Sequence, residues 1–212
     1  MNLLNDDVKK QIKEYLNFMK EKVTIVLFTK EAPCETCIET TDLLKEIVSL
    51  SSQLELIEKN FITDTQEVTK YHIEMVPSFV LLNAKGEYLG IKFNGIPAGH
   101  EINSLLGALI DMSGMDYGFD EATIKRIQAI TQPTNIKVFV TLSCPHCPGA
   151  VQTAHRLAML NKNIESEMIE AQTFHNLSVK YNVSGVPKII INETKELIGN
   201  QPVDAFLEQL EK

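Results

Sequence analysis

The chain has 212 residues, 44% of them hydrophobic, and a formal net charge of −8, so it has enough apolar residues for packed cores. Its acidic balance, with no run of more than two lysines or arginines, excludes a nucleic-acid-binding surface, because phosphate contacts need clustered basic side chains. Charged residues within positions 1–20 and the absence of an apolar run of about 18 residues predict neither a secretory signal nor a membrane helix, so we expect a cytoplasmic protein.

The first half of the chain predicts alternating helices and strands. A helix begins near Asn5 or Asp6, and the nearly continuous apolar run at 23–28 indicates a strand covered on both faces. We then expect a helix containing 43–50, a strand at 54–58, a helix at 64–71, a hairpin of 78–82 and 88–93, and a last helix at 101–112.

The second half predicts the same series again. Gly114 and Gly118 mark a join within 112–118, and Asp120 is the expected cap of a helix that spans 124–130. A strand at 136–142, a helix at 149–162, a strand at 164–170, a helix at 172–181, a hairpin at 188–199 and a helix at 203–211, with Pro202 in its first turn, follow. We therefore expect two units, residues 1–115 and residues 116–212.

Each unit contains two cysteines separated by two residues, placed where a strand gives way to a helix. The pairs are Cys34 with Cys37 and Cys144 with Cys147. A Val-Pro dipeptide follows each pair, and its proline, Pro77 or Pro187, lies 43 residues after the first cysteine. The spacing between the two copies is 110 residues, which indicates that one redox unit has been used twice.

This placement favours thiol–disulfide chemistry at both pairs. Two thiols at this spacing can close a disulfide, and the free N–H groups and dipole of a helix N-terminus favour the thiolate that attacks disulfides. Cys144 is thus a candidate nucleophile and Cys147 its resolving partner. His146 can add a positive charge near Cys144, whereas Glu35 places a carboxylate beside Cys34 and should oppose its ionisation.

Two carboxylates are candidate proton relays for the resolving thiols. Glu58 and Glu170 each lie at the expected end of the second strand of their unit, where a buried carboxylate could accept the thiol proton. The alternative at both positions is a solvated strand end.

The order strand, Cys-x-x-Cys, helix, strand, helix and X-Pro before a hairpin is the pattern of the thioredoxin fold. The chain resembles, over its full length, the tandem, glutaredoxin-like protein disulfide oxidoreductases of thermophilic archaea and bacteria. Their Cys-Pro-aromatic-Cys-Pro motif corresponds to Cys-Pro-His-Cys-Pro at 144–148, and the segments Gly-Ile-Pro-Ala-Gly-His-Glu at 95–101 and Val-Phe-Val-Thr at 138–141 are also similar.

The resemblance implies an α/β fold of two tandem thioredoxin-like units, each a mixed central sheet flanked by helices. It implies nucleophile roles for Cys34 and Cys144, resolving roles for Cys37 and Cys147, and cis prolines that face the disulfides at Pro77 and Pro187. It also implies side-by-side packing of the units and disulfide exchange with protein substrates.

Two departures from related folds bear on the electron donor. The chain has no tryptophan, so the Trp that precedes the first cysteine in thioredoxins is absent, and the Gly-Gly turn that glutaredoxins use near glutathione is also missing. We expect no bound cofactor and an outside donor, a flavoprotein of the thioredoxin reductase type, because a dithiol protein without flavin or nicotinamide sites cannot supply its own electrons.

Two alternatives remain open at this stage. The first is an electron-transfer module resembling the tandem N-terminus of alkyl hydroperoxide reductase flavoproteins, which would serve a peroxiredoxin; that relative has lost the first cysteine pair, whereas Cys34 and Cys37 are present here. The second is a non-enzymatic module in which the four thiolates bind a metal. A zinc site of this kind usually has roughly 15 to 20 residues between its pairs, and here residues 38–143 intervene.

Overall fold

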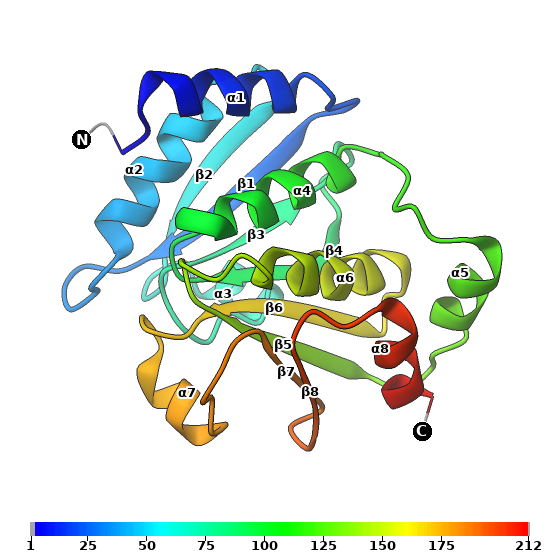
Figure 1. Cartoon of the computed structure of the whole chain (residues 1–212). Coiled ribbons are helices and arrows are strands. Elements are labelled where there is room, and N and C mark those ends of the chain that lie inside the picture. Colours follow the sequence, from blue (N-terminus) through cyan, green and yellow to red (C-terminus); the bar gives the residue numbers. More distant parts are fainter. Residues whose placement is uncertain (1–2, 212) are drawn as a thin grey trace.

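The computed structural model describes residues 3–211 and forms one mixed sheet with helices on both faces (Figure 1). The predicted caps are confirmed, because the side chains of Asn5 and Asp120 accept hydrogen bonds from Val8 N and Thr123 N at 2.9 and 2.7 Å. The elements of the first half are α1 (Asp6–Leu16), β1 (Val23–Thr29), α2 (Cys37–Val48), β2 (Leu54–Asn60), α3 (Thr65–Lys70), β3 (Ser78–Leu82), β4 (Tyr88–Asn94), the short 3₁₀ helix η1 (Gly99–Glu101) and α4 (Ile102–Met112).

The second half repeats this series. Its elements are α5 (Glu121–Gln128), β5 (Thr134–Val140), α6 (Cys147–Leu160), β6 (Ile164–Glu170), α7 (His175–Lys180), β7 (Lys188–Ile191), β8 (Lys195–Ile198) and α8 (Val203–Leu210). Helix α6 begins two residues earlier than predicted and carries Pro148 in its first turn, where a missing N–H costs nothing. Pro202 is the cap of α8 and not a residue of its first turn, which corrects the sequence prediction.

The sheet confirms the predicted α/β fold class. The strand order is β2-β1-β3-β4-β6-β5-β7-β8, so the order within the first four strands recurs in the last four. In the first half β1 is parallel to β2 and antiparallel to β3, and in the second half β5 has the same relations to β6 and β7. Neighbouring strands of one half therefore match those of the other in both order and direction.

The two halves join through a parallel pair of strands. β4 pairs with β6 from Ile91 opposite Ser166 to Asn94 opposite Ile169, which makes the sheet continuous across the join. A second link runs above the sheet, where Arg156 on α6 donates from Nε and Nη2 to the carboxylate of Asp111 on α4 at 2.7 and 3.1 Å. The second half thus extends the sheet of the first in the same strand order, with its β6 next to β4, and we call this arrangement head to tail.

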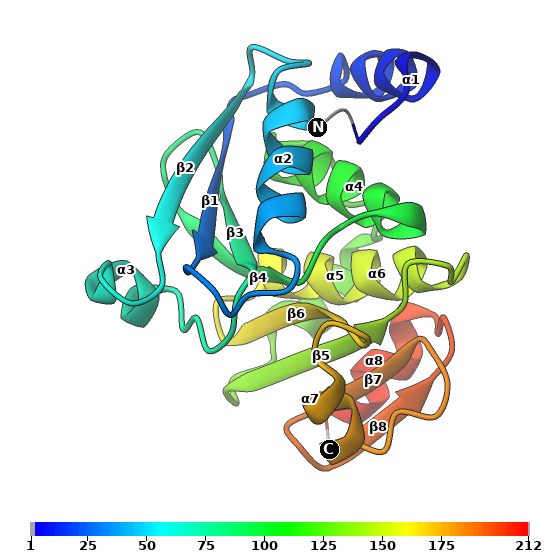
Figure 2. The same ribbon diagram turned by 90° about the vertical axis from the view of Figure 1, so that its left-hand side faces the viewer.

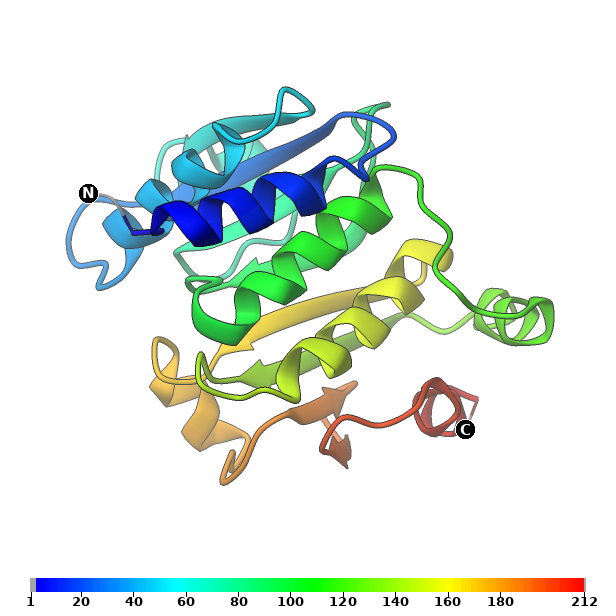
Figure 3. The same ribbon diagram turned by 45° about the horizontal axis from the view of Figure 1, so that its top comes forward.

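One face of the sheet carries a core shared by both halves. Helices α1, α4 and α6 lie side by side across it, as Figure 3 shows, and α2 completes the layer beside α1. Buried side chains from both halves contribute to this single core, among them Leu44, Leu109 and Leu157 from the helices and Ile91 and Val138 from the strands. Separating the halves would expose this apolar surface to water.

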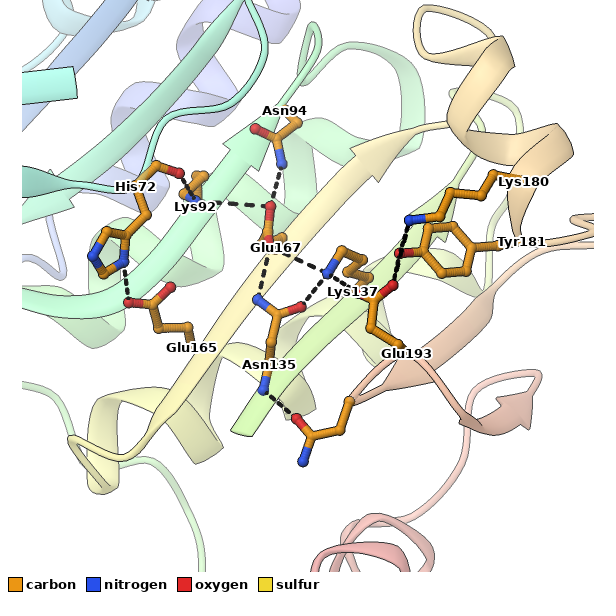
Figure 4. A network of polar contacts seen from close by, with 11 residues as sticks. His72, Lys92, Asn94, Asn135, Lys137, Glu165, Glu167, Lys180, Tyr181 and Glu193 are labelled. Atoms are coloured by element: carbon orange, nitrogen blue, oxygen red, sulfur yellow. Dashed lines mark hydrogen bonds and ion pairs between the residues drawn. The ribbon is translucent and has the colours of Figure 1, made fainter. Parts of the chain in front are cut away.

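The opposite face has two smaller apolar clusters with a polar network between them. Figure 2 shows α3 and α2 on opposite sides of β1, and α3 covers the cluster around Tyr71 while α7 covers the one around Tyr181. Between them, the buried Glu167 accepts hydrogen bonds from Asn94 Nδ2 (3.0 Å) and Asn135 Nδ2 (2.7 Å) and lies 3.8 Å from Lys92 Nζ (Figure 4). These partners compensate a charge that would be costly to bury alone.

We expect the two halves to tumble as one rigid body, because they share a sheet, a core and a buried polar network. Amide nitrogen relaxation by NMR should give one rotational correlation time for the whole chain. Two independent correlation times, one for each half, would contradict this arrangement. The predicted boundary between residues 115 and 116 stays a prediction.

None of the helices within residues 3–211 has the length and apolar character needed to cross a bilayer.

A second expectation concerns His155 on α6, which lies at the join. Its ring is 1% exposed, packs edge-on against Phe93 at 4.8 Å and contacts Ser166 Oγ through Nδ1 at 2.8 Å, while Nε2 has no hydrogen-bond partner. Burial lowers the pKa of His155 to about 3. The unfolded chain therefore binds this proton below a pH of about 6.5, whereas the folded chain does not.

The stability that this neutral histidine contributes is present above pH 6.5 and is lost as the pH falls toward 3. The cost approaches about 1.4 kcal/mol per pH unit. Urea unfolding of the parent and of His155→Leu at pH 7 and pH 4.5 should show a smaller acid loss in the variant. His175→Asn, at an exposed position, is the control and should follow the parent. Equal acid losses in parent and His155→Leu would refute the assignment.

Candidate active site

Both cysteine pairs form disulfides and lie at the same edge of the sheet. Cys34 is bonded to Cys37 and Cys144 to Cys147, with Cα–Cα distances of 5.6 and 5.5 Å. The pairs follow β1 and β5, which run in the same direction. β1 and β4 are both antiparallel to β3, and β4 and β5 are both parallel to β6. Four strand-to-strand steps separate β1 from β5, which corresponds to about 19 Å.

This separation argues against one metal site built from all four cysteines. A zinc ion needs its sulfur ligands at about 2.3 Å, and side chains cannot bridge a gap of about 19 Å between the pairs. Within residues 3–211, no group of three or more His, Cys, Asp or Glu residues is arranged to hold a metal ion.

The second cysteine of each pair is the more deeply placed one. Cys37 and Cys147 are the first residues of α2 and α6, and both are buried. Cys34 is partly exposed and Cys144 is 8% exposed, while Cys147 is fully buried. A first cysteine that is more exposed than the second suits a nucleophile followed by a resolving thiol, and the roles themselves stay predictions.

The structure confirms that Val76–Pro77 and Val186–Pro187 are cis. Cys144 Sγ lies 3.8 Å from Val186 O, so the C-terminal disulfide faces its cis-proline loop. The carbonyl groups of Pro77 and Pro187 accept hydrogen bonds from Gly95 N and Gly199 N at 2.9 and 2.8 Å, which holds both loops to their hairpins in the same way. The Ala32–Pro33 bond, just before Cys34, is also cis and was not predicted.

Of the two predicted proton relays, Glu58 is in the wrong place. Its side chain is 48% exposed and pairs with Lys45 at 2.8 Å, because β2 is the outermost strand of the sheet and continues to Asn60. The solvated alternative therefore holds at this position.

Glu170 is buried, as the relay hypothesis requires, but its carboxylate already has partners. Its two oxygens accept hydrogen bonds from the backbone N–H groups of Gln172 (3.2 Å) and Thr173 (2.6 Å). This carboxylate therefore organises the loop that leads into α7. Its relay role remains untested.

The structure reveals a buried carboxyl group that the sequence pattern assigned only to the start of a helix. Glu101 is fully buried in η1, accepts a hydrogen bond from Ser104 Oγ at 2.6 Å through Oε2, and has no partner for Oε1. Burial, together with the nearby charge of Glu170, raises the pKa of Glu101 to about 7. Its place in the sequence was a signal, since this acidic residue precedes the mostly apolar α4 and follows the segment 95–100, which has no counterpart in the second half.

Glu101 belongs to the first half, and its 3₁₀ helix lies against the second half. η1 packs against α6, whose first residue is Cys147. In the same segment, His100 N donates to Leu142 O at 2.8 Å, two residues before Cys144. Gly99 has a φ of +58° and lies so close to Leu142 O that a Cβ would meet it at 2.3 Å, so only glycine allows this approach.

His146 and Glu35, the two charged neighbours of the predicted nucleophiles, are both exposed, and His146 is the cap residue of α6. Because both side chains are exposed, any charge on them acts on Cys144 and Cys34 from the solvent-exposed surface. The effect predicted for each on its thiolate stays a prediction.

Comparisons with known proteins agree with this geometry. The thioredoxin domain family matches residues 134–212. The structure of the NTD_N/C domain of alkylhydroperoxide reductase AhpF from Enterococcus faecalis (V583) is 30% identical and covers 98% of this chain and 99% of that chain, with a TM-score of 0.91. The chain belongs to the thioredoxin-fold family of this domain. A protein disulfide oxidoreductase from Aeropyrum pernix K1 also superposes, at 29% identity and a TM-score of 0.91, over 98% of this chain and 92% of that chain.

Membership of this family makes the chain a thioredoxin-fold oxidoreductase, and its structure contains the disulfides Cys34–Cys37 and Cys144–Cys147. A curated member is the alkyl hydroperoxide reductase AhpF of Staphylococcus aureus (strain NCTC 8325 / PS 47), which is 31% identical over 208 residues. The match covers 98% of this chain but only 38% of that protein, so the chain spans about two fifths of the length of its curated relative.

Proposed function

We propose that the chain is a protein disulfide oxidoreductase in which both cysteine pairs exchange disulfides with polypeptide substrates. Cys34 and Cys144 are the nucleophiles, and Cys37 and Cys147 are the resolving thiols. The observation that supports this most strongly is the shared build of the two sites: each has a disulfide whose second cysteine is the more buried, and a cis-Val-Pro loop held to its hairpin by the same backbone hydrogen bond.

The reaction at the C-terminal pair transfers two electrons from the dithiol to the substrate. The Cys144 thiolate attacks one sulfur of the substrate disulfide, the substrate S–S bond breaks, and a mixed disulfide forms while one substrate thiolate leaves. Cys147 then loses its proton and attacks Cys144 Sγ, which forms the Cys144–Cys147 disulfide and releases the second substrate thiolate. The reverse sequence oxidises a substrate dithiol.

Glu101 accepts the proton of Cys147 in this proposal. A fully buried thiol cannot pass its proton directly to water, and a carboxyl group with a pKa of about 7 suits a general base that works near neutral pH. The unpartnered Oε1 of Glu101 is available for this proton. The first half of the chain thereby supplies the base for the disulfide of the second half.

An outside protein must reduce the oxidised pairs, and we propose a flavoprotein of the thioredoxin reductase type as this donor. The second candidate function is electron transfer to a peroxiredoxin, and the matches to the alkyl hydroperoxide reductase protein AhpF favour it specifically. The two functions use the same chemistry at the cysteines and differ in the partner that receives the electrons.

Insulin reduction tests the main proposal. The protein should accelerate insulin precipitation in the presence of dithiothreitol, and a thioredoxin reductase with NADPH should replace dithiothreitol as donor. Peroxide consumption with a purified peroxiredoxin, measured with the same donor, tests the second candidate. Peroxide turnover without insulin reduction would replace the first function by the second.

A further inference from the structure

A pocket of about 480 Å³ opens between the two halves beside the N-terminal disulfide. The first half contributes Glu35, which lies between Cys34 and Cys37, and Met75, which lies directly before the cis-Val76–Pro77 bond. The second half contributes the continuous wall 172–177, which leads into and begins α7. The pocket therefore touches both parts of the N-terminal site that a substrate would meet, namely the disulfide loop and the cis-proline loop.

The walls of the pocket combine apolar and polar side chains. Met75, Phe174 and Leu177 supply the apolar part, and Phe174 and Leu177 also pack against the cluster around Tyr181. Polar groups, among them the Glu35 carboxylate, line the rest. Such a mixture is typical of sites that bind a large apolar group and orient it with a few polar contacts.

The wall from the second half is held in place before any ligand arrives. The carboxylate of Glu170 accepts the N–H groups of Gln172 and Thr173, and Phe174 N donates to Glu170 O at 3.1 Å. Glu170 ends β6, which is paired with β4 of the first half. A preformed wall lowers the entropic cost of binding.

We propose that this pocket binds the large apolar side chain that neighbours the disulfide cysteine of a polypeptide substrate when the N-terminal pair acts on it. The inference rests on the proposed function. A substrate chain that lies along the cis-proline loop in extended form directs alternate side chains to one side. The side chain nearest the join then enters the pocket, where the flexible thioether of Met75 adapts to aromatic or long aliphatic groups.

Within residues 3–211, the C-terminal pair has no equivalent of Met75 or of the wall 172–177. By the repeat of 110 residues, Met75 corresponds to Gly185, and a Cβ built at Gly185 meets nothing within 4 Å. The wall 172–177 follows β6, the strand of the second half that pairs with β4 of the first half. The corresponding strand of the second half, β8, is at the edge of the sheet within residues 3–211, so no further strand and wall follow it. The head-to-tail arrangement thus makes the N-terminal site selective for large neighbours. A pocket of about 500 Å³ beside the C-terminal cis-proline loop is lined by Val183 and Ser184 but by no residue of the motif 144–147, so it does not join the C-terminal disulfide to its loop.

Peptide disulfides that differ at one position test this inference. In the Cys144→Ser/Cys147→Ser background, only the N-terminal pair reacts, and its rate constant is measured with two peptides that carry Phe or Gly beside the disulfide cysteine. Bis(hydroxyethyl) disulfide serves as a substrate without a side chain. The Phe peptide should react about tenfold faster than the Gly peptide, the factor expected for burial of one large apolar side chain.

Filling the pocket should remove this preference. Asn176 is an exposed residue of the wall, and Asn176→Trp should bring the Phe to Gly ratio close to one. The matched control is Gln66→Trp, at the equivalent exposed position of α3, which should keep the tenfold ratio. In the Cys34→Ser/Cys37→Ser background the C-terminal pair should show a ratio near one.

Each failure has a separate meaning. Reaction of both peptides at the same rate in the parent background, or an undiminished ratio in Asn176→Trp, overturns the pocket while the disulfide oxidoreductase function stands. Reaction with bis(hydroxyethyl) disulfide but with neither peptide overturns the proposed function and the pocket with it.

Discussion

Replacing Cys144 by serine is expected to remove more insulin-reducing activity than replacing Cys34, and the double replacement should remove all of it. Cys144 is followed by Pro145 and His146, which bring no negative charge to the start of α6, whereas Glu35 places a carboxylate next to Cys34. A thiolate better stabilised by about 1.4 kcal/mol corresponds to a reduction potential about 30 mV higher, so one charge interaction is enough to separate the two sites.

Alkylation rate against pH, measured for each nucleophile in the variant that lacks the other, gives the two thiol pKa values. We expect the lower pKa at Cys144. Glu35→Gln, which removes the charge and keeps the shape, should lower the pKa of Cys34 and narrow the difference between the sites. A lower pKa at Cys34 in the parent protein, or a greater loss of activity from Cys34→Ser, would reverse the assignment.

Replacing Glu101 by glutamine is expected to slow the release of the mixed disulfide at the C-terminal pair by about a hundredfold at pH 7, the lower end of the usual effect of a general base. The variant keeps the shape and the contact with Ser104 but cannot accept the proton of Cys147. In the parent, the rate should rise with pH through an inflection near 7, because only ionised Glu101 acts as a base. That inflection should be missing in Glu101→Gln.

Quenched-flow measurement of mixed-disulfide decay in the Cys34→Ser/Cys37→Ser background isolates this step. Ser104→Ala is the test of a purely structural role: it removes a hydrogen bond that stabilises the ionised carboxyl group, so the inflection should move to higher pH without being lost. Glu58→Gln, at an exposed position, should behave as the parent. An unchanged inflection in Glu101→Gln would assign the base role to another group.

Local pattern and spacing were sufficient for most of the elements and for the chemistry of the cysteines. The apolar run at 23–28 and the hairpin strands lie within one residue of β1, β3 and β4, because the alternation of apolar and polar residues and the turn residues act over short distances. The two Val-Pro dipeptides at one distance from a cysteine pair predicted both cis bonds of the site correctly. These features depend on residues that are neighbours in sequence, and a sequence shows them directly.

Everything that depends on how the two halves meet was decided by the tertiary structure. Glu58 and Glu170 were both expected at strand ends, yet the repeat matches Glu170 with Asn60, the last residue of β2, and Glu58 with Met168. Only Glu170 is buried, because β2 is an edge strand whereas β6 pairs with both β4 and β5. The helix η1, which ends at Glu101, packs against α6, which begins more than 40 residues further along the chain, and the wall 172–177 lines a pocket beside Glu35. The sequence by itself determined two redox units with their cysteines and prolines. The parallel β4–β6 contact determined how the two halves meet, and burial and pKa depend on such neighbours in space and not on neighbours in the chain.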